Sequence, residues 1–244
     1  MNLKDQACVV TGASVGIGRA IAAALGSHSA SVALVARSQP QLAETADLVR
    51  SAGGTATVHP VDLRDMQAVE MLAEQLSEQF SGISLIANVA GVWHDADRAY
   101  QGPLLHETPT SEILNVLDVG IRAPMILTAR LLPKMLNQAN GHVINISGTF
   151  SGGGASWLHY YVSKKALEQL TIGLAQELRK FEIQVNCVSP ADVATEPYKT
   201  FYPHDAESAL QPQDIAEVVL ELLSPACRNI TGQIVEVRNR RDHE

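Results

Sequence analysis

The feature that most constrains the fold is a glycine-rich segment near the start of the chain, Thr11-Gly12-Ala13-Ser14-Val15-Gly16-Ile17-Gly18. An apolar run at 7–10 precedes it, a helical pattern at 17–25 follows it, and a second strand-like run lies at 32–36. These elements predict a βαβ unit in which the glycines allow a tight turn and a close approach of the backbone to a ligand. The helix N-terminus behind such a turn offers N–H groups and a partial positive charge to a pyrophosphate. We therefore expect a dinucleotide to bind at Gly12, Ser14, Gly16, Ile17 and Gly18.

Strand-like and helix-like segments continue to alternate along the chain. The predicted strands are 7–10, 32–36, 55–60, 83–87, 142–146, 184–189 and 233–237, and the predicted helices are 17–25, 41–52, 66–80, 111–136, 160–180 and 213–223. Crossovers of this length favour parallel strands. The pattern predicts an α/β, doubly wound Rossmann fold, with a seven-stranded, mainly parallel sheet and helices on both faces. Since no long polar linker interrupts its 244 residues, we expect a single domain over 1–244.

Charge and cysteine content exclude several classes of protein. The 26 acidic and 18 basic residues give a net charge of −8, and the basic residues are scattered, which disfavours a nucleic-acid partner. The first residues do not resemble a signal peptide, and no apolar run approaches the ~20 residues that cross a bilayer, so we expect a cytoplasmic protein without membrane association. Cys8, Cys187 and Cys227 are widely spaced and lack nearby histidines, so we expect buried free thiols and no metal site.

The end of the second predicted strand indicates which dinucleotide binds. It has no carboxylate where an acidic residue would bind the ribose hydroxyls of NAD. Arg37 is placed to pair with a 2′-phosphate, which a guanidinium suits in charge and geometry, so NADP(H) is expected rather than NAD(H). A solvated surface arginine is the alternative. After the third strand, Asp62 and Leu63 are expected to meet the adenine, although Asp62 is equally suited to cap the next helix.

Tyr160 and Lys164 are four residues apart in a predicted helix, so their side chains share one face. A phenol titrates near ~10 when unperturbed, which is too high for an efficient base at neutral pH. A neighbouring ammonium and an oxidised nicotinamide both favour the phenolate and lower that pKa. Tyr160 is therefore a candidate proton donor in reduction and a candidate base in oxidation.

Five segments occur in an order typical of one known family. They are Thr11-Gly12-x-x-x-Gly16-x-Gly18, Asn88-Val89-Ala90-Gly91, Ser147, Tyr160-x-x-Ser163-Lys164 and Pro190-Ala191-Asp192-Val193-Ala194-Thr195. In these segments, and over essentially its whole length, the chain resembles the short-chain dehydrogenase/reductase family. The resemblance implies that Ser147 hydrogen-bonds the substrate oxygen, Tyr160 transfers the proton and Lys164 holds the nicotinamide ribose. It also implies cofactor contacts from Asn88, Ala90, Gly91, Pro190, Val193 and Thr195, and a homotetramer or homodimer.

The catalytic assignment has two competing alignments. Tyr161 and Lys165 repeat the spacing of Tyr160 and Lys164, but the family usually has Ser directly before its Lys, and Ser163 fits the Tyr160 register. The spacing back from Tyr160 favours Ser147 as the family's serine. Counting from the preceding strand instead points to Gly148, and a one-residue deletion in the loop would reconcile the two counts.

Gly120 is a further departure from the family. By pattern, Val116-Leu117-Asp118-Val119-Gly120-Ile121 matches the helical segment that normally carries an Asn at the place of Gly120. In the family, this residue bends the helix and presents its carbonyl to a water of the proton relay. Glycine keeps the carbonyl and tolerates a bend, so the resemblance implies a weakened relay.

The expected function is hydride transfer between NADP(H) and a carbonyl or alcohol substrate. Two irregular stretches, 92–110 and 191–211, follow predicted strands at the edge where ligands bind in such sheets. Their aromatic residues, with Trp157, either face an apolar or ring-bearing substrate or hold the loops to the core. They are Trp93, His94, Tyr100, Tyr198, Phe201 and Tyr202. The alternative function is that of a cofactor-binding sensor or structural protein with little turnover. Gly120, in place of the usual Asn, is the reason for considering it.

Overall fold

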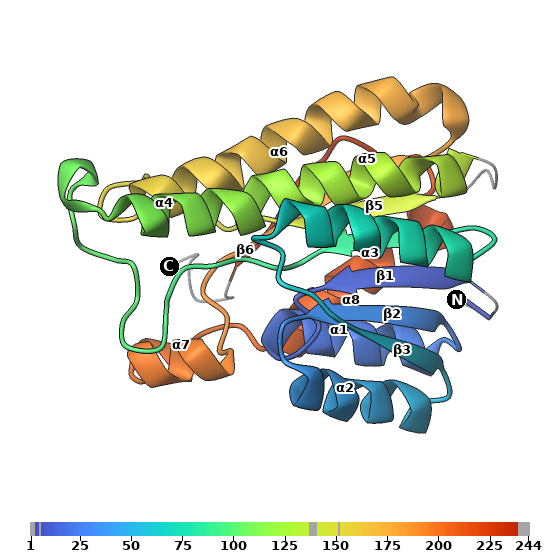
Figure 1. The fold of residues 1–244 in the computed structure, drawn as a ribbon, viewed down its shortest axis with the longest axis horizontal. Coiled ribbons are helices and arrows are strands. Elements are labelled where there is room, and N and C mark those ends of the chain that lie inside the picture. Colours follow the sequence, from blue (N-terminus) through green and yellow to red (C-terminus); the bar gives the residue numbers. More distant parts are fainter. Residues whose placement is uncertain (1–2, 5, 137–140, 151, 239–244) are drawn as a thin grey trace.

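The strands form one parallel sheet. The computed structural model describes residues 3–4, 6–136, 141–150 and 152–238. Within them the strands are β1 (Ala7–Thr11), β2 (Ser31–Ala36), β3 (Thr55–Pro60), β4 (Leu85–Asn88), β5 (His142–Ile146), β6 (Gln184–Pro190) and β7 (Ile234–Val237). They lie in the order β3-β2-β1-β4-β5-β6-β7, and every neighbouring pair is parallel (Figure 1). The predicted fold class is confirmed.

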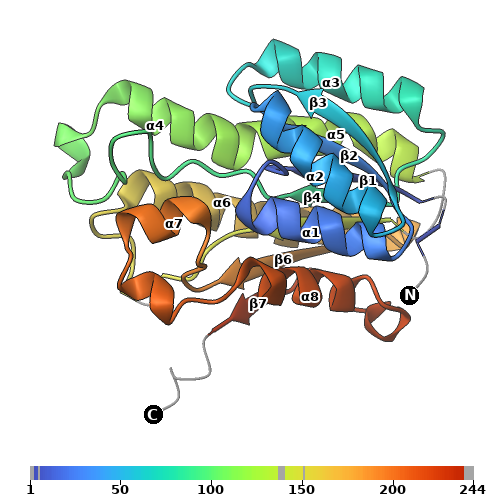
Figure 2. The same cartoon turned by 90° about the horizontal axis from the view of Figure 1, so that it is seen from below.

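Helices cover both faces of this sheet. One layer holds α1 (Gly16–Ser27), α2 (Gln39–Ser51) and α8 (Pro212–Leu222), and the other holds α3 (Met66–Gln79), α5 (Ala123–Leu136) and α6 (Leu158–Leu178) (Figure 2). The helix α4 (Thr110–Leu117) extends the line of α5, and the short helix α7 (Glu196–Phe201) lies beyond the sheet edge (Figure 1). None of the helices within the described residues is long and apolar enough to span a bilayer.

The strands are apolar on both faces because both faces are covered. In β1 and β2, Val10 and Val32 pack toward α1, α2 and α8, whereas Val9 and Ala33 pack toward α3, α5 and α6. Successive side chains of a strand point to opposite faces, so a continuous apolar run builds two cores at once. The expected burial of the three cysteines is confirmed, and none is paired.

The order of the strands fixes the position of a ligand site. From β1 the chain moves outward through β2 and β3, then returns to the other side of β1 as β4. In open parallel sheets, ligands bind outside the carboxyl ends of the strands where the order reverses, here between β1 and β4. The glycine-rich segment follows β1 directly and therefore lies at this point.

The long helix predicted over 111–136 is not continuous. A π-helical turn, Asp118–Arg122, separates α4 from α5 and contains Gly120. A Cβ at Gly120 would lie 2.8 Å from Ser163 Oγ on α6, so a side chain at this position would require the π-turn or α6 to shift. The periodicity predicted the helical region correctly but not its interruption, which falls where the family resemblance implied a bend.

Candidate active site

The loops that follow β1 and β4 are hydrogen-bonded to each other. Thr11 Oγ1 accepts hydrogen bonds from the N–H groups of Val89 (3.0 Å) and Ala90 (3.2 Å). Gly12 has φ of +65°, and a Cβ there would lie 2.9 Å from the backbone of Ala90. The predicted cofactor residues of the two loops therefore lie side by side.

The glycine-rich loop has the shape of a phosphate cradle. A Cβ at Gly18 would overlap the carbonyl oxygen of Gly12, and one at Gly16 would lie 2.8 Å from Thr195 Cγ2. The N-cap position of α1, Val15, supplies no side-chain hydrogen bond, so the first N–H groups of the helix are left for a ligand. Ser14 holds the loop through its carbonyl oxygen, which accepts from Arg19 Nε at 2.9 Å. Bare backbone and a helix N-terminus together fit the pyrophosphate of a dinucleotide.

Arg37 and Arg64 both act on Asp62. Arg37 is exposed directly after β2, and its side chain forms no hydrogen bond within the described residues. Arg64 forms a bidentate ion pair with Asp62. Arg64 Nε lies 3.0 Å from each carboxylate oxygen, and Arg64 Nη2 lies 2.5 Å from Asp62 Oδ2. The Arg64 guanidinium, assisted by the charge of Arg37, holds the pKa of the Asp62 carboxyl below its usual range. Sequence reasoning missed Arg64, although an Asp-x-Arg spacing allows this fork.

Asp62 was expected either to meet the adenine or to cap the following helix, and the start of α3 decides against the cap. Asp65, not Asp62, caps α3, since its carboxylate accepts from the N–H groups of Gln67 (3.0 Å) and Ala68 (3.2 Å). The N-cap alternative for Asp62 is therefore wrong. Leu63 is buried in the core beneath the loop, so the Leu63 side chain supports the loop from below.

A gap opens between the ends of β4 and β5. The two strands pair as far as Asn88 and Asn145, and beyond that point the N–H of Ala90 turns to Thr11. Lys164 reaches into the gap, and its Nζ donates to the carbonyl oxygen of Ile146 at 2.9 Å. Lys164 is 2% exposed, and burial lowers its pKa to about 8.

Tyr160 and Lys164 meet in this gap. Lys164 Nζ lies 5.4 Å from the centroid of the Tyr160 ring. A Cβ on Gly91 would lie 3.1 Å from Lys164 Nζ and 4.0 Å from the Tyr160 hydroxyl. Burial raises the pKa of the Tyr160 phenol, so the hydroxyl keeps its proton in the unliganded site. The glycine leaves room for a ligand beside both groups.

Tyr161 and Lys165, the alternative pair with the same spacing, contact other residues. Lys165 Nζ donates to both carboxylate oxygens of Glu168, at 3.0 and 2.9 Å, and the Lys165 side chain is 41% exposed. Tyr161 packs edge-on against Phe150, with ring centroids 5.1 Å apart. Tyr160 and Lys164 therefore lie in the gap, whereas Lys165 of the alternative pair is held in an ion pair with the buried Glu168.

Ser147 lies at the end of β5 with its hydroxyl directed toward α6. Ser147 Oγ donates to Glu168 Oε1 at 3.1 Å, and both residues are buried. Asn145, two residues earlier and on the same face, likewise donates to Thr171 of α6 at 2.8 Å. The hydroxyl expected to bind the substrate oxygen is thus hydrogen-bonded to the carboxylate of Glu168, a residue that the sequence analysis did not include.

Asn88 steadies the floor of the gap. Its Nδ2 donates to Asn145 Oδ1 at 2.8 Å and to Thr128 Oγ1 at 3.1 Å. Its Oδ1 is buried without a hydrogen-bond partner among the described residues. A buried acceptor of this kind costs free energy unless a ligand or water satisfies it. Asn88 therefore has one acceptor available beside the expected cofactor position.

The segment after β6 closes the site toward the glycine-rich loop. Pro190 ends β6, and Val193 forms a bridge with Leu210. Thr195 caps α7 by accepting from the N–H of Tyr198 at 3.4 Å, while its methyl group packs on Gly16. The structure thus brings Thr195 to the loop, as a cofactor contact requires.

Aromatic rings from three segments gather next to Tyr160. The Trp93 ring lies 6.0 to 6.3 Å from four others, those of Trp157, Tyr198, Phe201 and Tyr202. Trp157 in turn lies 6.0 Å from the Tyr160 ring. These rings are half-buried, so they join the two irregular stretches to each other and still present apolar surface. Tyr100 is buried apart from this aromatic cluster, against His159.

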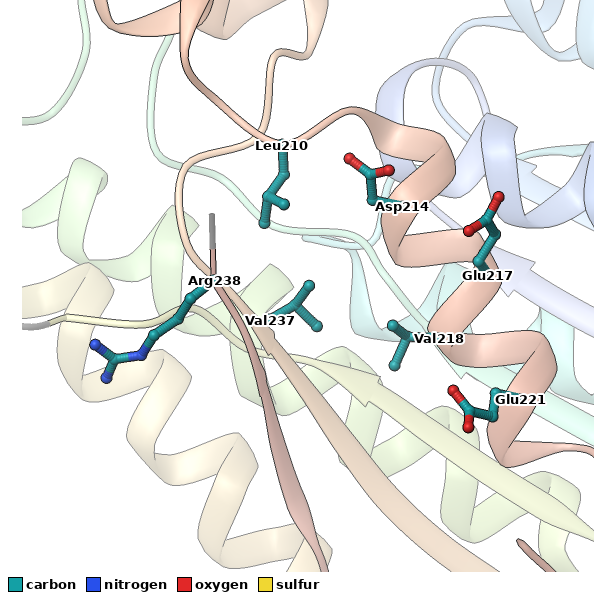
Figure 3. Close-up of a pocket in the computed structure, with 7 residues that line it drawn as sticks. All are labelled: Leu210, Asp214, Glu217, Val218, Glu221, Val237 and Arg238. Atoms are coloured by element: carbon teal, nitrogen blue, oxygen red, sulfur yellow. The ribbon is translucent and has the colours of Figure 1, made fainter. Parts of the chain in front are cut away.

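A separate hollow lies between α8 and the end of β7 (Figure 3). It is lined by Leu210, Asp214, Glu217, Val218, Glu221, Val237 and Arg238. It contains none of the residues predicted to bind cofactor or substrate. We assign it no role in the chemistry.

Comparison with known proteins identifies the family. A sequence model of the short chain dehydrogenase family matches residues 6–205. An uncharacterised oxidoreductase of Staphylococcus aureus is 33% identical over 224 residues, which cover 91% of this chain and 92% of that protein. The chain belongs to the short-chain dehydrogenase/reductase family, as its motifs predicted. It is an oxidoreductase with a Rossmann fold.

Solved structures show the same fold with either dinucleotide. A metagenomic short-chain oxidoreductase in complex with NADP has a TM-score of 0.83 and 32% identity, and the match covers 97% of this chain and 98% of the other. Carveol dehydrogenase from Mycobacterium avium, in complex with NAD, has a TM-score of 0.84 and 22% identity, and the match covers 97% of each chain. The second likeness shows the fold alone.

Proposed function

We propose that this protein transfers a hydride between NADP(H) and the carbonyl or alcohol carbon of a small molecule, with Tyr160 as the acid or base. The observation that carries the proposal is the meeting of the Tyr160 hydroxyl and Lys164 Nζ beside Gly91. When bound, the nicotinamide supplies or accepts the hydride. The remaining chemistry, a proton at the substrate oxygen, belongs to the protein.

Tyr160 donates that proton in the direction of reduction. Its burial keeps the phenol protonated until the substrate oxygen develops negative charge. Lys164 is charged below its pKa of about 8 and lies against the same ring, so it stabilises the phenolate that remains. In oxidation the same pair acts in reverse, with the phenolate as the base.

NADP(H) is the proposed cofactor, with NAD(H) as the alternative. Arg37 stands exposed after β2, as a partner for a 2′-phosphate should. Arg64 supports the choice because it neutralises Asp62, which would otherwise repel a phosphate next to Arg37. A guanidinium and a phosphate form strong, charge-assisted hydrogen bonds.

The substrate we propose is apolar or carries a ring. The half-buried aromatic cluster around Trp93 adjoins Tyr160 through Trp157. Flat apolar surface of this kind favours ring-bearing ketones and aldehydes over small polar ones.

We also propose a homo-oligomer formed through α4 and α6. The residues Leu114, Leu158 and Val162 on these helices are 51%, 41% and 47% exposed. Apolar side chains gathered on neighbouring helices are stabilised when a second copy covers them. Sedimentation at several concentrations should give a dimer or tetramer, and a double substitution of Leu158 and Val162 by Asp should shift it toward the monomer.

The test of the function is NADPH oxidation with a panel of ketones, quinones and aldehydes. Tyr160→Phe removes one oxygen atom and should lower turnover by roughly 100-fold or more, because general acid catalysis contributes that much. Tyr161→Phe is the matched control and should keep turnover. NADPH binding, measured by fluorescence, should be unchanged in both. Loss of turnover in Tyr161→Phe alone would reverse the assignment.

The second candidate function is that of a cofactor-binding sensor. Two observations favour it: the Ser147 hydroxyl is hydrogen-bonded to Glu168, and glycine occupies position 120. Tight NADPH binding without turnover across the whole panel would select this function over the first.

A further inference from the structure

The backbone beyond β5 alternates in a way that exposes one N–H group. The N–H of Ser147 donates to Val188 at 2.9 Å, and that of Thr149 donates to Pro190 at 2.8 Å, so both point toward β6. In a parallel ladder, the residue between two such residues directs its N–H and carbonyl to the opposite side. The N–H of Gly148 therefore points away from β6, to the side on which β4 ends.

That side is the gap that holds Tyr160 and Lys164. The carbonyl of Ile146 has the same direction as the Gly148 N–H, and it accepts from Lys164 Nζ. If β4 were longer, it would pair with the Ile146 carbonyl and the Gly148 N–H. Instead the chain leaves the sheet, and the N–H of Ala90 donates to Thr11 Oγ1. The Gly148 N–H has no hydrogen-bond partner among the described residues. It is a donor aimed into the gap.

Gly148 and Tyr160 both lie next to the aromatic ring of Phe150. A Cβ at Gly148 would lie 3.5 Å from Phe150 Cε2, an ordinary contact, and the Phe150 ring lies 5.9 Å from that of Tyr160. The absence of a side chain leaves the Gly148 backbone uncovered. A substrate oxygen next to the Tyr160 hydroxyl is therefore within the region that this N–H faces.

We propose that the main-chain N–H of Gly148, and not the hydroxyl of Ser147, donates the second hydrogen bond to the substrate oxygen. The proposal rests on the proposed hydride transfer and assigns a catalytic residue to it. The N–H transfers no proton. It stabilises the negative charge that develops on the oxygen while Tyr160 delivers the proton. Ser147, bonded to Glu168, then has a structural role.

Three variants test the assignment kinetically. Ser147→Ala and Gly148→Ala both keep the N–H and should retain kcat/KM for ketone reduction within a few-fold. Gly148→Pro removes that donor, besides fixing φ at this position, and should lower kcat/KM by roughly 100-fold, the usual effect of losing one such donor. NADPH binding by fluorescence should be equal in all three, which controls for folding. A loss in Ser147→Ala as large as that in Tyr160→Phe would overturn the proposal.

A second measurement does not depend on turnover. Protein labelled with ¹⁵N-glycine is saturated with NADP⁺, and acetophenone is added, which cannot react with the oxidised cofactor. The Gly148 amide, identified as the signal missing in Gly148→Ala, should move downfield as it donates to the ketone oxygen, while that of Gly173 on α6 stays in place. The same movement should persist in Ser147→Ala. A stationary Gly148 signal at saturating ketone overturns the proposal, whereas failure of NADP⁺ to bind overturns the proposed function.

Discussion

The ammonium group of Lys164 hydrogen-bonds to the carbonyl oxygen of Ile146 in the gap where β4 leaves the sheet. A backbone carbonyl thus holds a buried charge at the place where the next pair of the β-ladder would form. One hydrogen bond compensates little of the lost hydration, which is why burial lowers the pKa of Lys164 to about 8.

The first prediction concerns pH. Lys164 is charged below about 8 and neutral above it, so kcat/KM for reduction should fall as the pH rises through that value. Lys164→Arg should move the fall to higher pH, because a guanidinium stays charged. Lys165→Arg is the matched control and should leave the profile in place. An unchanged profile in Lys164→Arg would contradict the role of this charge.

Arg37 should decide between the two dinucleotides. Arg37→Ala should weaken binding of NADP⁺ and of 2′,5′-ADP by roughly 10-fold to 100-fold, since a charge-assisted hydrogen bond contributes about 1.5–3 kcal/mol. NAD⁺ binding should not change. Arg64→Gln should weaken the same ligands less, by leaving Asp62 charged and unpaired near the phosphate. Calorimetry measures all three ligands, and Arg130→Ala, which loses only a surface pair with Glu70, is the control. Equal losses for NAD⁺ and NADP⁺ would argue against a phosphate contact.

Two glycines should respond oppositely to alanine. Gly120→Ala forces a methyl group to within 2.9 Å of Ser163 Cβ and should destabilise the fold by about 1–3 kcal/mol, as overpacking does. Gly173, within α6, has nothing within 4 Å of its Cβ position. Gly173→Ala should therefore stabilise the protein by about 0.5–1 kcal/mol through helix propensity. Urea unfolding measures both, and equal effects would show that the contact with Ser163 is not tight.

His142 should make the protein sensitive to acid. Burial lowers its pKa to about 4, from an ordinary value of 6.5, and its Nδ1 is buried without a partner among the described residues. Between those values the unfolded chain binds a proton that the native state does not, so the free energy of unfolding falls as the pH drops from 6.5 toward 4. His142→Gln should flatten this part of the curve, whereas His204→Gln, at an exposed position, should not. Parallel curves for the wild type and His142→Gln would refute the assignment.

Trp93 should matter in proportion to the size of the substrate. Trp93→Ala removes the ring at the centre of the aromatic cluster and should lower kcat/KM for ring-bearing ketones by roughly 3-fold to 10-fold, the value of one aromatic contact. Acetone should be reduced at an unchanged rate. Phe181→Ala, at an exposed ring beyond the end of α6, is the control. An equal loss for large and small ketones would indicate a purely structural ring.

Much of the fold follows from the sequence because it depends on periodicity. The bounds of β3 and β5 agree with the prediction to the residue, and the five motif segments all lie at the carboxyl edge of the sheet or on α6. The π-turn at Gly120 was not visible in the periodicity, although the family resemblance implied a bend at this position. The cap of α3 is a different case: the helix begins at Met66 as predicted, so its N-cap position is Asp65, and the assignment of that role to Asp62 was wrong.

The sequence indicated candidate residues but not Glu168 or Arg64, and it did not indicate where the side chains point. The sequence motifs bring Tyr160 and Lys164 together, yet no spacing rule shows that the Ser147 hydroxyl faces Glu168. That direction depends on which face of β5 meets α6. The fork between Arg64 and Asp62 was likewise hidden, since it requires a turn geometry that propensities do not encode.

The close approach of Gly12 and Ala90 limits how such enzymes can be recombined. A Cβ at position 12 would lie 2.9 Å from the backbone of Ala90, so the loop after β4 leaves no space for a side chain there. A segment transplanted from a relative in place of residues 11–18 must therefore keep glycine at the position of Gly12, because any side chain there would meet the backbone of Ala90.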